Sequence, residues 1–365
     1  MIKKIAFFLP TLNIGGVERV FITYANYLAS LSYRVDFVLC KKEGDLLPLL
    51  SSNINLYDLN DVQLRFSFYK LRKYIKKNQP DYIITGGDFP NFIAILSSLN
   101  LRKQPKVIIS QHNYYNIESK RLGWWANFTC TLMKILYPMS HKVIAISDGI
   151  YDFLKKDIGI QDRKIVKIPN PIDREDIIVK SNDQPFIELP EEYIVFIGRL
   201  GYVKNLPFLL NSFENANVKN VKLLIVGNGE MMADLKMQAK RMRKGGLVSF
   251  VGAVENPLPI LKKSKLLVLP SFSEAYPTIL LEALCLNVPI LATPTNGAKE
   301  ILRDIPGTCF SADFNDADMF AKLLETCINN KIDEKIAEQK LSQNSIEVIG
   351  NIILSEIIEN NENYS

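Results

Sequence analysis

Short apolar runs alternate with amphipathic stretches along the whole chain of 365 residues. The runs are rich in Val, Ile, Leu and Phe, which is typical of strands buried in a parallel sheet. They occupy residues 4–10, 34–40, 81–85, 106–110 and 142–147 in the first half, and residues 193–198, 222–227, 248–252, 265–270 and 288–292 in the second. Residues 17–31 and 66–77 have the periodicity of amphipathic helices. This alternation predicts an α/β fold with parallel sheets and right-handed crossovers.

The segment from residue 169 to residue 192 interrupts the alternation, because it contains four prolines and many charges. Such a composition is typical of an interdomain connection, and the chain is too long for one compact core. We therefore expect a first domain at 1–170, a linker at 171–192 and a second domain at 193–340. A C-terminal helix and tail at 341–365 are expected to pack back on the first domain. Ligands of doubly wound domains bind at the carboxyl ends of the strands, here facing a cleft between the domains.

The composition is that of a soluble globular protein, with 47% hydrophobic and 23% charged residues. The five cysteines are far apart and form no Cys-x-x-Cys pair, so we expect reduced thiols. Two histidines are too few for a histidine-rich zinc site. The apolar run near the start, Ile5–Leu9, is too short for a secretory signal, and no run is long enough to span a bilayer. These features favour a cytoplasmic protein.

Charge is unevenly distributed along the chain. Residues 1–180 contain 26 Lys and Arg against 16 Asp and Glu, whereas residues 181–365 contain 18 against 23. A basic first half indicates an anionic partner, either a nucleic acid or an anionic membrane surface. Lys120 and Arg121 precede Trp124 and Trp125, a combination suited to a membrane interface. The alternative is a packed helix with one tryptophan in the core.

Several residues of ligand-binding type follow the expected strands. Gly15 and Gly16 lie between a strand and a helix, where a backbone can approach an anion closely, unless they only form a turn. Arg199 and Lys204 follow the first strand of the second domain and would clamp a diphosphate, unless they are solvent-facing charges. His112 ends another strand and is either structural or part of the site.

Two glutamates stand eight positions apart, Glu274 in a loop and Glu282 inside an apolar helix. A buried carboxylate is costly unless it is paired, so Glu282 either lies on a solvated face or binds donors. If both lay on a helix, eight residues would span roughly 12 Å, comparable to the distance from the sugar to the ribose of a nucleotide-sugar. One glutamate would then bind sugar hydroxyls and the other ribose hydroxyls.

The start of the helix that contains Glu282 would bind the diphosphate, which lies between the sugar and the ribose of a nucleotide-sugar. Pro277 fits the first turn of a helix. The backbone N–H groups of Thr278, Ile279 and Leu280 would then hold phosphate oxygens.

Together these motifs make the chain resemble a retaining glycosyltransferase of family 4, a family built on two facing Rossmann-like domains (the GT-B architecture). The resemblance covers nearly the whole length through "GGVER", "VIAISDGIYDFL", "KIPNPID", "FIGRLGYVKNLPFLL", "LLIVGNGE", "VSFVGAVEN" and the Glu-x7-Glu stretch. It implies that Gly16 lies near the donor phosphates and that Arg199 and Lys204 bind the diphosphate. It also implies that Glu274 contacts the transferred sugar, that Glu282 holds the ribose and that His112 lies near the reaction centre.

The sequence departs from the family pattern in three places. "TGGDFPN" stands where many relatives have a His-rich segment, which puts Asp88 near the acceptor side by position alone. Ala275-Tyr276-Pro277 replaces Gly-Phe-Gly or Gly-Phe-Pro, and Asn296-Gly297 replaces a frequent Gly-Gly pair. The nucleotide-binding motifs are therefore carried over, whereas the sugar specificity and the acceptor contacts are not.

The resemblance predicts transfer of a hexose or N-acetylhexosamine from a nucleotide-sugar, a UDP-sugar first and GDP-mannose second. The expected acceptor is a glycan or a polyprenyl-linked glycan, in surface polysaccharide or glycoconjugate synthesis. We expect no cofactor and no metal, peripheral attachment to the anionic cytosolic membrane surface, and no nucleic-acid partner. The alternatives are a nucleotide-sugar epimerase of the same architecture, a basic nucleic-acid-binding protein and a catalytically inactive scaffold.

Overall fold

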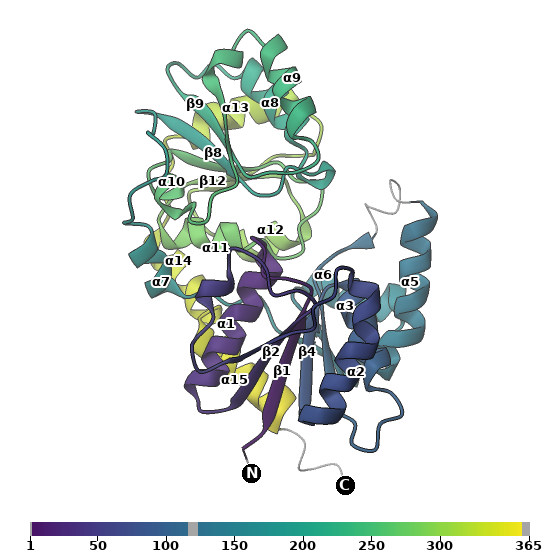
Figure 1. Cartoon of the computed structure of the whole chain (residues 1–365). Coiled ribbons are helices and arrows are strands. Elements are labelled where there is room, and N and C mark those ends of the chain that lie inside the picture. Colours follow the sequence, from purple (N-terminus) through teal and green to yellow (C-terminus); the bar gives the residue numbers. More distant parts are fainter. Residues whose placement is uncertain (1, 116–122, 360–365) are drawn as a thin grey trace. The chain divides into compact units, whose positions relative to one another are not determined.

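The computed structural model describes residues 2–115 and 123–359 and divides into two compact units. The first unit runs from the N-terminus to Pro171 and includes the C-terminal segment from Ile346. The second unit is Ile172–Ser345. Each contains a parallel sheet with helices packed against it (Figure 1). The prediction of an α/β chain with two Rossmann-like domains is confirmed.

The sheet of the first unit has the strand order β3-β2-β1-β4-β5-β6-β7, with all neighbours parallel. Its strands are β1 (Lys4–Leu9), β2 (Arg34–Leu39), β3 (Asn55–Asp58), β4 (Tyr82–Gly86), β5 (Lys106–Gln111), β6 (Lys142–Ala145) and β7 (Ile165–Lys167). The order reverses direction between β1 and β4, which is the switch point where doubly wound sheets bind ligands.

The helices of the first unit pack against this sheet or against one another. They are α1 (Gly16–Ser30), α2 (Ser67–Asn78), α3 (Asp88–Ser98), α5 (Trp124–Leu136), α6 (Asp148–Asp152) and α15 (Ile346–Ile353). Phe7 of β1 stacks on Phe37 of β2 with ring centroids 5.8 Å apart, and its edge meets Phe21 of α1. These fully buried rings form the core beneath the start of α1.

The C-terminal segment belongs to the first unit through direct contacts. Helix α15 lies against α1 because Gly350 leaves room for the ring of Tyr27, which a Cβ at this position would meet at 2.0 Å. Beyond α15, the carbonyl oxygen of Ile358 accepts a hydrogen bond from the Tyr82 hydroxyl at 2.9 Å. The chain therefore returns to the domain in which it began.

The sheet of the second unit has the order β10-β9-β8-β11-β12-β13, again entirely parallel. Its strands are β8 (Tyr193–Ile197), β9 (Lys222–Val226), β10 (Val248–Gly252), β11 (Leu266–Leu269), β12 (Ile290–Ala292) and β13 (Thr308–Phe310). Its helices are α7 (Arg174–Lys180), α8 (Leu206–Asn215), α9 (Met232–Arg241), α10 (Leu258–Lys262), α11 (Thr278–Cys285), α12 (Asn296–Leu302), α13 (Ala317–Cys327) and α14 (Glu334–Gln343).

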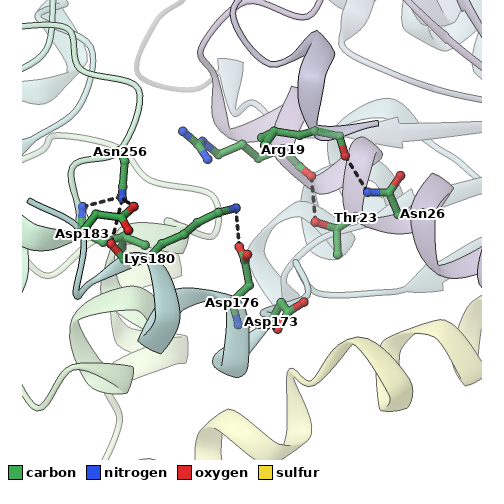
Figure 2. A network of polar contacts seen from close by, with 10 residues as sticks. Arg19, Thr23, Asn26, Asp173, Asp176, Lys180, Asp183 and Asn256 are labelled. Atoms are coloured by element: carbon green, nitrogen blue, oxygen red, sulfur yellow. Dashed lines mark hydrogen bonds and ion pairs between the residues drawn. The ribbon is translucent and has the colours of Figure 1, made fainter. Parts of the chain in front are cut away.

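The expected linker at 171–192 is instead part of the second unit from Ile172 onward. The Asp173 side chain caps α7, and this helix contacts α10 and α11. Asn256 donates hydrogen bonds to the Lys180 carbonyl and to Asp183 Oδ2, each at 2.8 Å, and so ties the following residues down (Figure 2). The prolines and charges of this segment suggested a free connection, but these polar contacts anchor it.

The expectation of reduced thiols needs correction. Cys309 of β13 and Cys327 of α13 form a disulfide, so the thiols are not all reduced; Cys40, Cys130 and Cys285 are free.

Strands β3, β7 and β13 were not predicted, because each has only three or four residues and none is a fully buried run. Among residues 2–115 and 123–359, no helix is both long and apolar enough to cross a bilayer.

Candidate active site

The cationic residues predicted for the second unit lie in the loop that follows β8. Lys204 is in a short 3-10 turn (Tyr202–Lys204), and its side chain is only 21% exposed. Arg199 is 78% exposed and forms a 3.2 Å ion pair with Glu230. Because exposed ion pairs contribute little to stability, Arg199 is easily redirected toward a ligand.

Lys204 and Glu274 form one cluster. Lys204 Nζ lies 2.6 Å from Glu274 Oε1, and the hydroxyl of Ser271 donates to the same oxygen at 2.6 Å. Glu274 is 9% exposed and Ser271 is fully buried. The sequence placed Lys204 on the diphosphate and Glu274 on the sugar as separate ligands, but the structure joins them. Ser271 was not predicted, although its position three residues before Glu274 in a tight loop could have suggested the contact.

Helix α11 begins directly after this cluster. Pro277 occupies the position before the helix, at its N-cap, one residue earlier than the first-turn position expected from the sequence. The Leu280 N–H donates to the Pro277 carbonyl at 3.1 Å, so it already has a partner within the protein. Thr278 and Ile279 supply the leading N–H groups, and no acidic residue lies in the first turn to oppose an anion.

Glu282 lies on α11 between the buried residues Leu281 and Ala283 and is itself half-buried. It interacts with other residues of the chain and is not a bare buried charge. Glu274 lies outside the helix, so the helical spacing of eight residues does not describe the separation of the two carboxylates. Glu282 does lie one turn beyond the start of α11, as the sequence predicted.

Gly297 fixes the loop that carries Glu274. Its N–H donates to the Glu274 carbonyl at 3.1 Å. A Cβ at Gly297 would lie 2.7 Å from that carbonyl oxygen and 2.5 Å from the carbonyl oxygen of Ala275. The sequence showed Gly297 only as half of an altered Gly-Gly pair, whereas the structure shows that a side chain here would displace the Glu274 loop.

In the first unit, Gly15 and Gly16 begin α1 after β1, as predicted. No atom of the described chain lies within 4 Å of a Cβ placed at Gly16, so packing does not require glycine there. The Glu18 carboxylate folds back over Gly15, and burial raises its pKa. Glu18 was overlooked in the sequence, although it stands inside the "GGVER" motif.

His112 directly follows β5, as predicted. Its Nε2 atom is buried and has no hydrogen-bond partner in the part of the chain that the structure describes. A Cβ at Gly86 would lie 3.1 Å from this atom, and the imidazole packs near Phe21. Burial lowers the pKa of His112 to about 4. His112 is therefore a neutral hydrogen-bonding group at neutral pH.

Asp88 begins α3 and is 9% exposed. Its carboxylate accepts hydrogen bonds from Gln111 Nε2 at 3.0 Å and from the Tyr115 hydroxyl. Gln111 in turn accepts from the Tyr137 hydroxyl at 2.7 Å. Burial raises the pKa of Asp88, while its hydrogen bonds oppose this shift. These contacts place Asp88 in a buried hydrogen-bond network of the first unit. Its place near the acceptor side stays a prediction from its position in the sequence.

Trp124 and Trp125 begin α5 and are 65% and 50% exposed. Their rings stack with centroids 4.1 Å apart, and Phe128 meets Trp125 edge-on. The alternative that one tryptophan lies in the core is therefore wrong. Lys120 and Arg121, which the sequence grouped with them, lie outside the described residues.

Two family models match the chain and together cover most of it. Residues 14–176 match the family described as Glycosyltransferase Family 4, and residues 179–348 match Glycosyl transferases group 1. The boundary between the two matches falls close to the division between the units of the structure.

The chain is also similar to proteins named as glycosyltransferases along nearly its full length. It is 30% identical to a Campylobacter jejuni α-1,4-N-acetyl-D-galactosaminyltransferase named for a diphosphoundecaprenol-linked acceptor, over 90% of this chain and 89% of that protein. It is 26% identical to an Escherichia coli enzyme named UDP-Gal:α-D-GlcNAc-diphosphoundecaprenol α-1,3-galactosyltransferase, over 87% and 86% of the two chains.

Among solved structures, Anabaena HepE in complex with UDP and glucose matches with a TM-score of 0.78 and 17% identity, over 98% of this chain and all of that one. A glycosyltransferase from Rickettsia africae matches with a TM-score of 0.76 and 19% identity, over 98% and 99% of the two chains. At this identity the similarity concerns the fold.

Proposed function

Since this chain is a member of the group 1, family 4 glycosyltransferases, we propose that it transfers a hexose or N-acetylhexosamine from a UDP-sugar to a polyprenyl-diphosphate-linked glycan. The names of the relatives support this choice, because one specifies UDP-Gal and both specify a diphosphoundecaprenol-linked substrate. GDP-mannose is the second candidate donor. Retention of the anomeric configuration belongs to the same proposal.

The observation that carries the proposal is the cluster of Lys204, Glu274 and Ser271 beside the start of α11. It brings a cation from the loop after β8 together with a carboxylate and helix N–H groups from the segment between β11 and the start of α11. A diphosphate suits the cation and the N–H groups, and a carboxylate suits sugar hydroxyls. Glu282 is assigned to the ribose hydroxyls from its place on the same helix.

The reaction breaks the bond between the anomeric carbon and the diphosphate oxygen, and negative charge develops on the leaving diphosphate. Lys204, Arg199 and the N–H groups of Thr278 and Ile279 would stabilise that charge. The acceptor hydroxyl bonds to the anomeric carbon on the face from which the diphosphate departs, as the family mechanism implies, and its proton passes to the departing diphosphate oxygen. His112, neutral at the working pH, is assigned to hydrogen bonding at the reaction centre.

A lipid-linked acceptor brings the enzyme to a membrane surface. The exposed pair Trp124 and Trp125 and the basic balance of residues 1–180 support peripheral attachment to an anionic leaflet. We assign this attachment to the first unit.

Donor binding by the Lys204 and Arg199 variants tests the proposal. UDP-sugars should raise the melting temperature of the wild-type protein by mass action. Lys204→Ala and Arg199→Ala should each weaken donor binding more than tenfold, because a charge-assisted hydrogen bond contributes about 1.5–3 kcal/mol. Lys219→Ala is the matched control, because Lys219 is an exposed lysine of the same unit. Unchanged donor affinity in both variants would contradict the diphosphate assignment.

A further inference from the structure

A groove in the first unit is lined by none of the residues assigned above to the donor. It runs between α2, with the 3-10 turn before it (Leu64–Phe66), and α3, and these two helices contact each other (Figure 1). Its volume is about 1010 Å³, at the upper end of the range for small-molecule sites. Apolar side chains dominate its lining, chiefly Leu64, Phe68, Tyr69, Phe89, Ile93 and Leu96.

The groove leaves large apolar side chains in contact with solvent. Tyr69 is 78% exposed, Phe89 is 48% exposed and Leu96 is 38% exposed. Contiguous exposed apolar surface on a folded protein marks a binding site for a protein, a membrane or a ligand. Helix α5, which carries the exposed Trp124 and Trp125, also contacts α3.

The edge of the groove is cationic, because Arg65 and Arg72 line it. The rest of residues 63–78 contains four lysines and no acidic residue, and one of them, Lys70, forms a 2.7 Å ion pair with Asp61. The Arg65 guanidinium lies over the ring of Phe66 at 5.0 Å, and the Arg72 guanidinium donates to the carbonyls that end α3. Fixed cations beside an apolar channel complement a molecule with a hydrocarbon chain and an anionic head.

This combination of an apolar lining and a cationic edge favours a lipid chain over a peptide as the occupant of the groove. A peptide brings backbone N–H and C=O groups, which need hydrogen-bond partners when they are buried. The lining offers few such partners, since the Arg72 N–H groups already bond to the carbonyls of Ser97, Leu99 and Asn100. A hydrocarbon chain needs none.

We propose that the groove between α2 and α3 binds the isoprenoid chain of the lipid-linked acceptor, with the cationic edge of α2 near its diphosphate. The inference rests on the proposed function and extends it by assigning a second binding site for the acceptor, separate from the one for its sugar. The groove thereby favours acceptors with long chains over soluble glycan analogues.

Acceptors with one glycan head and different chains test the proposal in the full-length enzyme. The KM of the wild type should fall at least tenfold when a two-carbon chain is replaced by an isoprenoid of three or more units. Leu96→Trp fills the groove, and it should raise the KM for the long-chain acceptor at least tenfold without changing its kcat or the KM for the short-chain acceptor. Met237→Trp, at an exposed position on α9, is the matched control. A long-chain preference that survives in Leu96→Trp would overturn the proposal.

Photo-crosslinking gives a readout that does not depend on turnover. Benzophenone-labelled farnesyl diphosphate should label peptides within residues 64–72 and 89–100, and unlabelled polyprenyl phosphate should compete. Labelling elsewhere would overturn the assignment, as would equal competition by phosphatidylglycerol vesicles, which would identify a bulk-lipid site.

A dimer that dissociates in Leu96→Trp would instead identify the groove as a contact between two copies. If no acceptor is glycosylated but the label still falls in the groove, the proposed function fails and the lipid site stands.

Discussion

Glu274 receives two donors at one oxygen, the ammonium of Lys204 and the hydroxyl of Ser271. A diphosphate that attracts Lys204 must therefore alter the surroundings of this carboxylate. In our account, donor binding and the orientation of Glu274 are coupled through Lys204. The Ser271 hydroxyl would still donate its hydrogen bond to Glu274 while Lys204 interacts with both the carboxylate and the diphosphate.

Substitution of the two glutamates should separate turnover from donor affinity. Glu274→Gln should mainly lower kcat, because Glu274 is assigned to the sugar that moves in the transition state. Glu282→Gln should mainly raise the donor KM, because ribose contacts are the same in ground and transition states. Ser271→Ala should lower kcat less than Glu274→Gln does, because it removes one hydrogen bond to Glu274 but leaves the carboxylate itself. Steady-state kinetics of the three variants check this, and identical defects would contradict the division of roles.

His112 should give the protein a specific sensitivity to acid. Burial lowers its pKa from 6.5 to about 4, so the unfolded chain binds a proton more readily than the folded one. Its contribution to stability is present above pH 6.5 and is lost as the pH falls from there toward 4. Between pH 7.5 and pH 5.0 the wild type should lose roughly 2 kcal/mol through this group.

Urea unfolding of wild type and His112→Gln at the two pH values measures this contribution. Other titrating groups are common to both proteins, so the difference between their unfolding free energies isolates His112. The wild type should lose about 2 kcal/mol more than the variant on acidification. Parallel losses would show that His112 is not held neutral by burial.

Residue types at strand ends could be predicted from the sequence, but their contacts could not. His112 directly follows β5, and Arg199 and Lys204 lie in the loop that follows β8, as the apolar pattern predicts. Ser271 and Glu18 were missed although each lies three residues from its partner, because these contacts depend on the conformation of the loop before α11 and of the start of α1. The pairing of Lys204 with Glu274 links residues 70 positions apart, beyond any local pattern.

At the scale of elements, the site depends on how closely α12 approaches the loop before α11. Gly297→Ala would place a methyl group within 2.5–2.7 Å of the carbonyl oxygens of Ala275 and Glu274. Backbone atoms do not yield as a flexible side chain does, so we expect about 1–3 kcal/mol of destabilisation. The displaced Glu274 should also lower kcat severalfold.

Gly246→Ala is the matched control, because no atom lies within 4 Å of a Cβ at that glycine and its φ is not positive. Thermal unfolding and steady-state kinetics of both variants check the expectation. Wild-type stability and kcat in Gly297→Ala would contradict the role given to this contact.

Elements with a long apolar run could be predicted, and short or polar ones could not. All ten apolar runs contain strands, and α1 and α2 begin within one residue of the predicted helices. Strands β7 and β13 have three residues each, too few to show alternation. Helix α7 was hidden in a proline-rich segment, because its place is fixed by contacts with α10 and α11 rather than by its own composition.

At the scale of the whole molecule, we expect catalysis that needs no divalent metal, since Lys204, Arg199 and the start of α11 are assigned to the leaving charge. Turnover should survive dialysis against EDTA within a factor of two. Addition of Mg²⁺ or Mn²⁺ should not raise it. Activity that chelation abolishes and a metal restores would move leaving-group stabilisation from these residues to an ion.

The most direct test of the central claim is glycosyl transfer to a defined acceptor. Wild-type enzyme is incubated with each UDP-sugar and GDP-mannose and a polyprenyl-diphosphate-linked glycan, and the product is analysed by mass spectrometry and NMR. Our account predicts a mass gain of one hexose or N-acetylhexosamine, an α linkage, and release of the nucleoside diphosphate, with turnover strongly reduced in Glu274→Gln. A folded enzyme that yields no product from any of these donors, or a β-linked product, would contradict it.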